Sequence, residues 1–457
     1  MNNTHTSTYL NKKHTYNVID SLTVKVTVTE NPYRLEMNDL FLMAARVNKK
    51  RSFLFVSKLL GKHIPIVPQT GLLIGALLAA RYAEIVHDSK SNVTHELISY
   101  FQKDVKAFKM SPFIELPSAP VIIGFAETAT ALGYAFFECI NDAVFFHTTR
   151  EKLVDYSPIV TFEEEHSHAT SHRCYVNEKM LNNDREVILV DDEITTGKTA
   201  LNIIRSIQKN YPRRKYTVIS ILDWRSESDI EAFQKAECEL GITIHTVSLL
   251  KGTVETNGAV KQTPLLNKNT LHETQSIETI YMDDYFQPPL KVVNNYSINQ
   301  VGVINETPYL SETGRFALTS DSFEDIDAWI KKIAAFLKKY RSHPKSKTLC
   351  LGTNEFMYIP MRVSAEMGEG IFYHSTTRSP IHASSQTGYG ANFRLEFPNP
   401  EDQSVTNYVY NIEPEKYGEL FLFFEREVEE TKLTPLLQEL KKTRIPHIKI
   451  VFFNRKN

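Results

Sequence analysis

The chain has 457 residues, enough for two or three domains. Its 52 Lys and Arg residues nearly balance its 54 Asp and Glu residues, which argues against a nucleic-acid or acidic-membrane partner. The 4 cysteines lack the spacing of a zinc site or a disulfide framework, as suits a reducing cytoplasm. The polar first residues predict no signal peptide, and the most apolar run, 71–80, is too short to cross a bilayer. We therefore expect a soluble, cytoplasmic protein.

The first part of the chain combines a polar segment with a basic cluster. Residues 1–35 are rich in Asn, Thr and Lys, and we expect a partly ordered N-terminal arm with one β-like patch at 22–28. Basic residues then gather between Arg46 and His63. They fit a solvated surface, a wall facing a small anion, or a nucleic-acid contact. Because no larger basic field surrounds them, we favour the small anion.

Apolar patterns then predict a strand that ends beside a loop suited to anions. Residues 72–83 and 93–108 predict two helices, and 121–123 predict a short buried strand that ends at Gly124. A loop of small and polar residues follows and leads into a helix from 131. Helix N-termini present unpaired N–H groups, so this geometry favours anion binding. The loop residues in question are Glu127, Thr128, Ala129 and Thr130.

The next strand, 144–146, leads to Arg150, whose planar and permanent charge suits a phosphate contact. Three glutamates and three histidines follow at 163–173. They suggest a metal site at first, but a polar loop offers no fixed scaffold for one. We therefore do not favour a metal site, and His166, His168 and His172 would instead supply acid–base groups near neutral pH.

The stretch with the most specific pattern is 187–199, V-I-L-V-D-D-E-I-T-T-G-K-T. Four apolar residues predict a buried strand, and Asp191 and Asp192 follow at its exit. The segment Thr195–Thr199 then surrounds a glycine with hydroxyl groups just before a helical pattern. The helix N-terminus and the hydroxyls suit a phosphate, while the carboxylates suit a vicinal diol or a magnesium-bound ligand.

An ATP-binding loop is the obvious alternative, because Gly197-Lys198-Thr199 matches the end of its motif. That motif also needs a glycine five residues before Gly197, where this sequence has Asp192. The ATP interpretation therefore fails.

The stretch closely resembles the phosphoribosyl pyrophosphate (PRPP) signature of type I phosphoribosyltransferases. Two residues depart from that signature: Glu193 stands where the family usually has an apolar residue, and Lys198 where it usually has glycine. Neither change removes a phosphate donor, and the lysine adds one. The position of the 163–173 segment also matches the mobile catalytic loop of that family, so the resemblance implies a lid that closes over the reaction and excludes water.

The resemblance implies roles for the residues singled out above. Asp191 and Asp192 would hold the ribose diol and would be candidate Mg²⁺ ligands, with the metal arriving on PRPP. The first loop and Arg150 would hold pyrophosphate. Apart from the resemblance, the Arg46–His63 segment is our candidate for the acceptor pocket. The implied catalytic residues are Asp191, Asp192, His166, His168 and Arg150. The implied PRPP-binding residues are Thr195, Thr196, Gly197, Lys198, Thr199, Glu127, Thr128, Ala129 and Thr130.

Beyond the motif, 216–222 predict another strand, and Trp224 at its exit would stack on a base or, more commonly, lie in the core. We expect a phosphoribosyltransferase domain at 36–245 and a polar linker or insertion at 246–305. The amphipathic pattern at 322–341 predicts a helix in a second domain, 306–457.

The second half repeats part of the first. In both halves a glutamate lies three residues after a glycine: Glu127 after Gly124, and Glu355 after Gly352. The arginine of a Thr-Thr-Arg segment lies 26 residues after the same glycine, as Arg150 in the first half and Arg378 in the second. Identical spacing indicates an internal duplication. Apolar residues 421–424 would match the strand before the aspartates, and 425–426 would replace the acidic pair, with no glycine turn after them. We therefore expect a degenerate copy without a sugar site, and catalysis by the N-terminal half alone.

The tetrapeptide at 377–380, T-R-S-P, resembles the one that names the TRSP domain, which follows a phosphoribosyltransferase-like domain in proteins encoded near bacterial tellurium-resistance genes. The resemblance covers roughly 36–450 and implies a biosynthetic or stress-related role in nucleotide metabolism.

These features predict an α/β protein of the type I phosphoribosyltransferase fold, with a mostly parallel sheet flanked by helices and a second α/β domain. The resemblance implies a pentosyltransferase that uses Mg²⁺ and PRPP to transfer phosphoribosyl to a base-like nitrogen nucleophile, or the reverse. The alternative is a non-catalytic sensor of PRPP or a nucleotide. Acceptor identity stays open, and a homodimer is compatible with the family.

Overall fold

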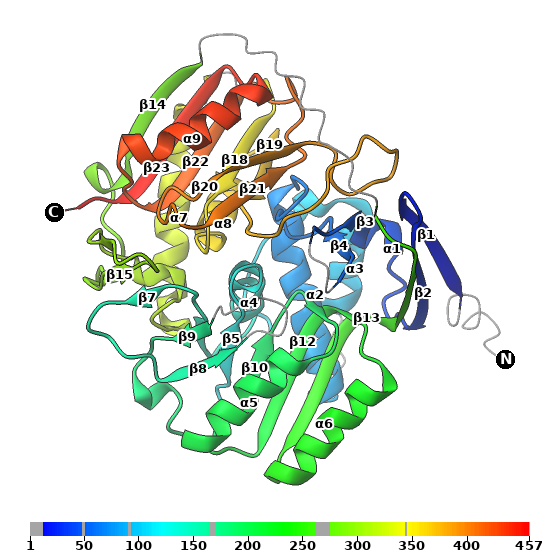
Figure 1. Cartoon of the computed structure of the whole chain (residues 1–457). Coiled ribbons are helices and arrows are strands. Elements are labelled where there is room, and N and C mark those ends of the chain that lie inside the picture. Colours follow the sequence, from blue (N-terminus) through cyan, green and yellow to red (C-terminus); the bar gives the residue numbers. More distant parts are fainter. Residues whose placement is uncertain are drawn as a thin grey trace.

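Two β-sheets with helices between and around them form the molecule, one sheet built mainly from each half of the chain (Figure 1). The computed structural model describes residues 12–47, 51–89, 93–163, 171–260, 275–342 and 345–456. Here the N-terminal half means residues up to 260 and the C-terminal half means residues from 275. No helix in these described ranges is long and apolar enough to cross a membrane.

The larger sheet has five parallel strands at its centre, as the predicted fold requires. Antiparallel strands β1 and β2 extend one edge, β17 extends the other, and β11 pairs with β12 beside the main path. In spatial order the strands are β1 (Lys13–Ile19), β2 (Leu22–Glu30), β13 (Thr243–Asn257), β12 (Lys215–Asp223), β10 (Val187–Val190), β5 (Val121–Gly124), β6 (Val144–His147) and β17 (Leu318–Thr319), with β11 at Glu193–Ile194. All four residues of β5, β6 and β10 are buried, as expected for central parallel strands whose residues are apolar apart from His147 at the end of β6.

Several strands lie where the sequence predicted arm or linker. Strands β1 and β2 come from the expected N-terminal arm and are ordered members of the sheet. Strand β13 runs across the expected boundary between 245 and 246. The expected linker also contributes β14 (Ser276–Tyr281), β15 (Ser297–Ile298) and β16 (Ile304–Asn305). Hydrogen bonding to existing sheet edges organises these polar segments, which have little periodicity of their own.

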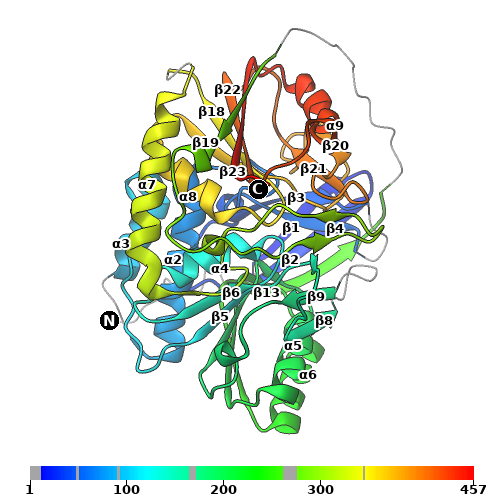
Figure 2. The same ribbon diagram turned by 90° about the vertical axis from the view of Figure 1, so that its left-hand side faces the viewer.

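Helices cover both faces of the larger sheet (Figures 1 and 2). Helices α2 and α4 pack on one face, and α5 and α6 lie on the other. The helix predicted at 93–108 ends earlier, as α3, and a short 3₁₀ turn follows it. The bounds are α1 Met37–Leu40, α2 Pro68–Val86, α3 Val93–Lys103, α4 Ala129–Phe137, α5 Lys198–Asn210 and α6 Glu227–Leu240.

The second sheet is all-parallel, in the order β14, β23 (His447–Asn454), β22 (Glu419–Arg426), β18 (Thr348–Gly352) and β19 (Ile371–Ser375). Its helices are α7 (Phe323–Lys339), α8 (Tyr358–Glu366) and α9 (Glu430–Leu440). Small antiparallel pairs complete the molecule: β3 (Phe41–Ala45) with β4 (Phe53–Ser57), β8 (Val160–Glu163) with β9 (Ser171–Cys174), β20 (Arg394–Pro398) with β21 (Thr406–Tyr410), and β7 (Lys152–Leu153) with β15.

The predicted duplication reappears in the backbone hydrogen bonds. The N–H of Thr148 donates to Gly124 O at 2.9 Å, and the N–H of Thr376 donates to Gly352 O at 3.0 Å. The same two threonine hydroxyls accept the N–H groups of Ala126 and Asn354, both at 2.9 Å. The two halves therefore share one strand–loop–helix–strand unit, repeated in three dimensions.

The two units pack against each other through their helices. Helix α8 contacts both α2 and α4, and the views in Figures 1 and 2 agree that these helices lie between the two sheets. The rings of Tyr134 on α4 and Tyr358 on α8 stack with centroids 3.9 Å apart. One hydrophobic cluster runs through this contact and includes strand residues of both sheets, such as Ile188 and Phe421. Burial of this shared face joins the halves into one body.

Candidate functional site

Three chain segments that carry the predicted site leave the larger sheet at the same edge. The parallel register aligns Val190 of β10 with Gly124 of β5, and Gly124 with His147 of β6. Asp191, the first loop and Thr148 therefore follow side by side at the carboxyl ends of neighbouring strands. This is the edge where open α/β sheets bind their ligands.

The acidic pair and the glycine turn have the local geometry that the sequence predicted. The N–H of Asp192 donates to the Asp191 carboxylate at 2.9 Å, which fixes the first aspartate at the strand exit. Gly197 has φ +74° and caps the N-terminus of the 13-residue helix α5. A Cβ at this glycine would lie 2.4 Å from the Phe233 ring, so both the backbone angle and the space call for glycine.

The phosphate-suited turn is open rather than packed away. Thr195, Thr196, Gly197 and Thr199 are half-buried, and Lys198 is exposed. The Thr196 hydroxyl accepts the N–H of Lys198 at 3.3 Å, while α5 directs its first N–H groups towards the turn. The segment therefore combines hydroxyl groups, helix N–H groups and a cationic side chain on an accessible surface.

The first loop, by contrast, is buried. Glu127 and Thr128 are each 6% exposed, and the Ala126–Glu127 peptide bond is cis. The Glu127 carboxylate accepts the N–H of Arg378 from the C-terminal half at 3.3 Å. The Thr130 hydroxyl donates to Glu127 O at 2.9 Å, and Ala129 begins α4. Sequence reasoning placed this loop correctly on the strand exit but missed Arg378 above it.

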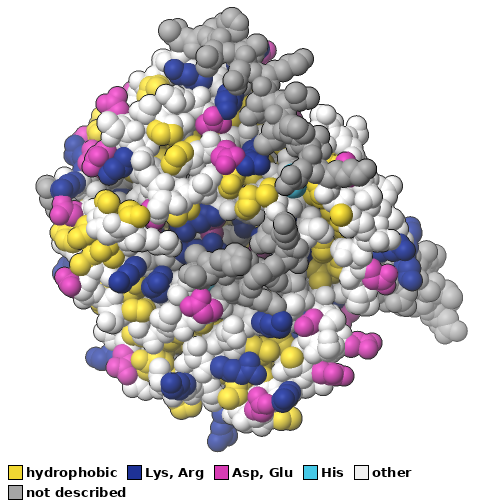
Figure 3. All heavy atoms as spheres, in the orientation of Figure 1, with side chains coloured by type: hydrophobic (Ala, Val, Ile, Leu, Met, Phe, Trp, Pro, Cys, Tyr) yellow, Lys and Arg dark blue, Asp and Glu magenta, His cyan; other side chains and the backbone are white. Residues whose placement is uncertain are grey.

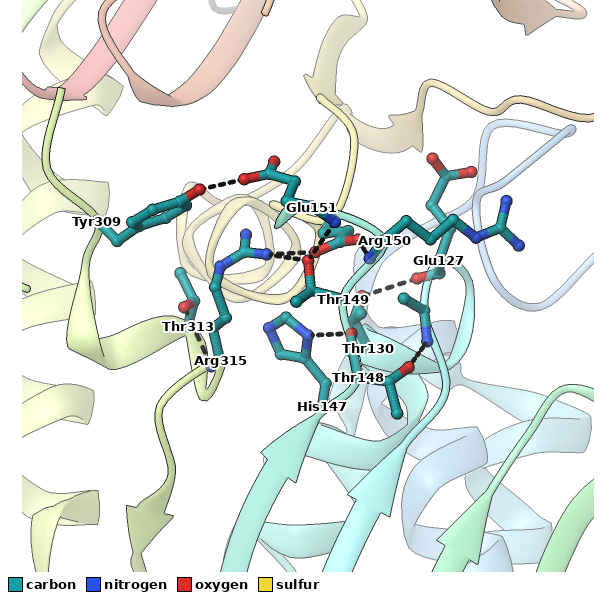
Figure 4. A network of polar contacts seen from close by, with 12 residues as sticks. Glu127, Thr130, His147, Thr148, Thr149, Arg150, Glu151, Tyr309, Thr313 and Arg315 are labelled. Carbon is teal, nitrogen blue, oxygen red and sulfur yellow. Dashed lines mark hydrogen bonds and ion pairs between the residues drawn. The ribbon is translucent and has the colours of Figure 1, made fainter. Parts of the chain in front are cut away.

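Arg150 lies beside Glu127 and also contacts the C-terminal half. Its N–H donates to Glu355 at 2.9 Å, and its carbonyl accepts the Arg173 guanidinium at 3.0 Å. Figure 4 shows its side chain extending away from Arg315 towards Glu127. The duplicated Gly-x-x-Glu and Thr-Thr-Arg spacings mark the residues that make these cross-half contacts, but they do not show which residue pairs with which.

The histidine-rich segment is only partly placed. His166 and His168 lie outside the described residues, whereas His172 on β9 is buried. The His172 ring stacks on Phe162 with centroids 5.0 Å apart, and its Nδ1 lies 2.8 Å from the Thr148 hydroxyl. That hydroxyl holds the first loop through Ala126. His172 therefore supports the loop from beneath, and strands β8 and β9 flank the segment that holds the other two histidines.

Two members of the basic cluster contact the candidate site, one at the motif and one at the first loop. Arg51 forms an ion pair with Glu193 at 2.5 Å, and Lys62 Nζ donates to the Thr128 hydroxyl. The contact with Arg51 explains why Glu193 stands where the phosphoribosyl pyrophosphate signature usually has an apolar residue, because the carboxylate has a specific cationic partner there. Trp224, considered above as a base-stacking residue, is 6% exposed and stacks on Phe55 with centroids 4.7 Å apart. Its ring is part of the core.

The counterpart of the aspartate pair in the C-terminal half takes part in buried ion pairs. The register aligns Gly352 with Phe423, so Phe424 and Glu425 lie at the positions of the aspartate pair, one residue earlier than the 425–426 expected from sequence. The side chain of Arg315 is 2% exposed, and its guanidinium donates a hydrogen bond to the Thr149 hydroxyl at 2.7 Å. The same guanidinium forms ion pairs with Glu355 and, at 3.2 Å, with Glu425.

The same network sets the protonation of its members. Burial would raise the pKa of Glu355, but the neighbouring Arg315 and His147 and the Arg150 N–H lower it to about 2. Burial, together with Arg315, lowers the pKa of His147 to about 4, so this imidazole is neutral near pH 7. Figure 4 shows the Arg315, Thr149 and His147 side chains converging beside β6.

A separate cavity of about 770 Å³ lies between the halves. Arg150, Arg173 and Arg378 line one side of it, Arg426 and Glu401 lie deeper, and the Asp191–Thr199 motif is not part of its lining. The space-filling view shows a hollow near the middle of this face with Lys and Arg side chains inside it (Figure 3). The cavity therefore adjoins the first loop through Arg150 and Arg378 rather than covering the sugar-phosphate motif.

Asp191 and Asp192 are the oxygen donors of the motif, and both are accessible enough to reach a ligand. Carboxylates suit Mg²⁺, especially where the metal arrives bound to phosphate groups. Within the described ranges no three His, Cys, Asp or Glu residues are grouped as a metal site. The two carboxylates are a donor set that would suit a magnesium ion brought in by a phosphate-bearing ligand.

Two family models match the chain. The family described as "Phosphoribosyl transferase" matches residues 40–253. A second family, the TRSP domain that lies C-terminal to it, matches residues 312–440. No curated protein sequence matches the chain.

Among solved structures, adenine phosphoribosyl transferase from Trypanosoma brucei is 14% identical, with 49% of this chain and 82% of that chain covered and a TM-score of 0.30. Orotate phosphoribosyltransferase from Mycobacterium tuberculosis is 14% identical, with 47% and 91% covered and a TM-score of 0.23. From the two family matches, the chain contains a phosphoribosyl transferase domain followed by a C-terminal TRSP domain.

Proposed function

We propose that the N-terminal half binds Mg²⁺ and PRPP and transfers the phosphoribosyl group to a base-like nitrogen nucleophile. The observation that carries the proposal is the Asp191–Asp192 pair directly before an open glycine turn at the start of α5. In this proposal the aspartates bind the ribose hydroxyls, and 195–199 bind the 5′-phosphate.

The reaction forms a bond from nitrogen to ribose C1 and breaks the bond from C1 to pyrophosphate. The sugar passes through an oxocarbenium-like state, so placement and charge stabilisation supply most of the catalysis. Magnesium, when bound, would neutralise charge that develops on the leaving pyrophosphate. Arg150 and the Glu127–Thr130 loop are the protein groups we assign to that pyrophosphate, and His166 or His168 would accept the proton that the nitrogen loses. The same groups serve the reverse reaction.

The segment from Arg46 to His63 is our candidate for the acceptor pocket. Arg51 and Lys62 support this assignment, because they contact Glu193 and Thr128, one on each of the two loops proposed to hold PRPP. An acceptor bound against β3 and β4 would then lie next to the sugar.

A sensor is the second candidate, and one observation favours it. The Glu127 carboxylate of the first loop contacts Arg378 of the C-terminal half. A ligand that moves this loop would therefore also change the position of Arg378. Pyrophosphate release from PRPP, assayed with a panel of bases and other nitrogen nucleophiles, separates the two functions. Release that depends on one class of acceptor supports the transferase. PRPP binding without release, whatever the acceptor, supports the sensor and removes the catalytic proposal.

A further inference from the structure

The two halves hold each other's loops in a reciprocal manner. Glu355, from the C-terminal half, accepts the N–H of Arg150 at 2.9 Å. Glu127, from the N-terminal half, accepts the N–H of Arg378 at 3.3 Å. These four residues are the duplicated glutamate and arginine of each half, so each Gly-x-x-Glu loop binds the Thr-Thr-Arg segment of the other. Such reciprocity is the geometry of a twofold-symmetric interface, here within one chain.

The two contacts differ in what surrounds them. Glu355 is tied into a buried cluster by Arg315, which also pairs with Glu425 at 3.2 Å. The side chain of Glu127 is 5% exposed, and its Oε1 accepts no hydrogen bond within the described residues. Arg378 Nε lies 3.6 Å from that oxygen. Across the halves, the Glu127 carboxylate therefore contacts Arg378, whereas the Glu355 carboxylate is held by both Arg315 and the N–H of Arg150.

Arg378 also has room to act on a ligand-bearing loop. Its side chain is 19% exposed and lines the cavity beside Arg150. A buried carboxylate next to a site for polyanions would repel them unless a cation neutralised it. Arg378 supplies that cation from the C-terminal half.

We propose that Arg378 is a positioning residue for the N-terminal site: it neutralises Glu127 and fixes the 127–130 loop in the shape that receives pyrophosphate. This inference rests on the proposed function. It changes the expectation that the N-terminal half acts alone, because the TRSP domain completes the loop although its own sugar site is lost.

Three full-length variants test the inference: Arg378→Gln, Arg378→Lys and, as a matched control, Arg455→Gln. The control removes an arginine with 37% side-chain exposure that pairs with Asp283. Calorimetric titrations use Mg²⁺ with PRPP and, separately, ribose 5-phosphate. Thermal unfolding of each variant measures its effect on stability.

We expect Arg378→Gln to weaken PRPP binding by about tenfold or more, a difference of roughly 1.4 kcal/mol. Ribose 5-phosphate lacks pyrophosphate, so its affinity should stay within about twofold, and Arg378→Lys should recover part of the PRPP affinity. Equal losses for both ligands would indicate a merely structural role and overturn the inference, as would unchanged PRPP affinity. A wild-type chain that binds neither ligand would instead remove the proposed function and, with it, this inference.

Discussion

Gly197 offers a sharp test of the proposed 5′-phosphate turn, through the substitution Gly197→Ala. The glycine has φ +74°, a conformation that costs an L-residue roughly 1–2 kcal/mol. The new Cβ would also lie 2.4 Å from the buried Phe233 ring, and overpacking of this kind costs about 1–3 kcal/mol. Phe233 is 4% exposed and lies under the Arg225 guanidinium, so it has little room to yield.

The start of α5 must therefore shift, and the N–H groups proposed to bind phosphate shift with it. We expect the Kd for PRPP, measured by calorimetry, to rise between roughly tenfold and a hundredfold. Gly241→Ala is the matched control, because Gly241 has φ +64° at the end of α6 and nothing within 4 Å of the added Cβ. It should lower stability slightly and leave PRPP affinity unchanged.

A second variant separates the clash from the backbone strain. Phe233→Leu added to Gly197→Ala should restore part of the affinity, because it removes ring atoms from the path of the new Cβ. If Gly197→Ala and Gly241→Ala lower stability equally and neither changes PRPP binding, the turn does not hold the phosphate and the reasoning is wrong.

Two further predictions concern the buried polar cluster. Arg315→Met should lower the free energy of unfolding, measured in urea, by about 3–5 kcal/mol, because Glu355 and Glu425 would lose their buried cation. Arg444→Gln, the control, removes a surface ion pair and should cost less than about 1 kcal/mol. Equal losses in the two variants would contradict this account. His147 has its folded-state pKa lowered to about 4 from 6.5, so the unfolded chain takes up its proton first on acidification. Stability from this group is complete above pH 6.5 and falls by about 3 kcal/mol as the pH drops to 4. His147→Gln should flatten that part of the stability–pH curve measured by denaturant titration, and an unchanged slope would contradict the assignment.

The sequence was informative where the structure is local. The strand, acidic pair and glycine turn at 187–199 are contiguous, and their geometry follows from a few neighbouring residues. The internal duplication was also visible, because both copies keep the same spacing of glutamate and arginine.

Contacts between distant segments were not predictable in the same way. Glu127 and Arg378 are 251 residues apart, and Arg150 and Glu355 are 205 apart, so no local pattern pairs them. The arm-like residues 13–30 became sheet strands because β13 offers an edge to pair with. The one-residue offset at Glu425 likewise depends on strand register, which apolar composition alone does not fix.

The central claim is that Asp192 belongs to a working phosphoribosyl site. Comparison of Asp192→Asn with the wild-type chain in PRPP-dependent pyrophosphate release tests it most directly, with circular dichroism to verify the fold. We predict that turnover falls about a hundredfold or more, equivalent to roughly 3 kcal/mol of lost transition-state stabilisation, while the fold stays intact. Unchanged turnover in a correctly folded Asp192→Asn chain would contradict the account.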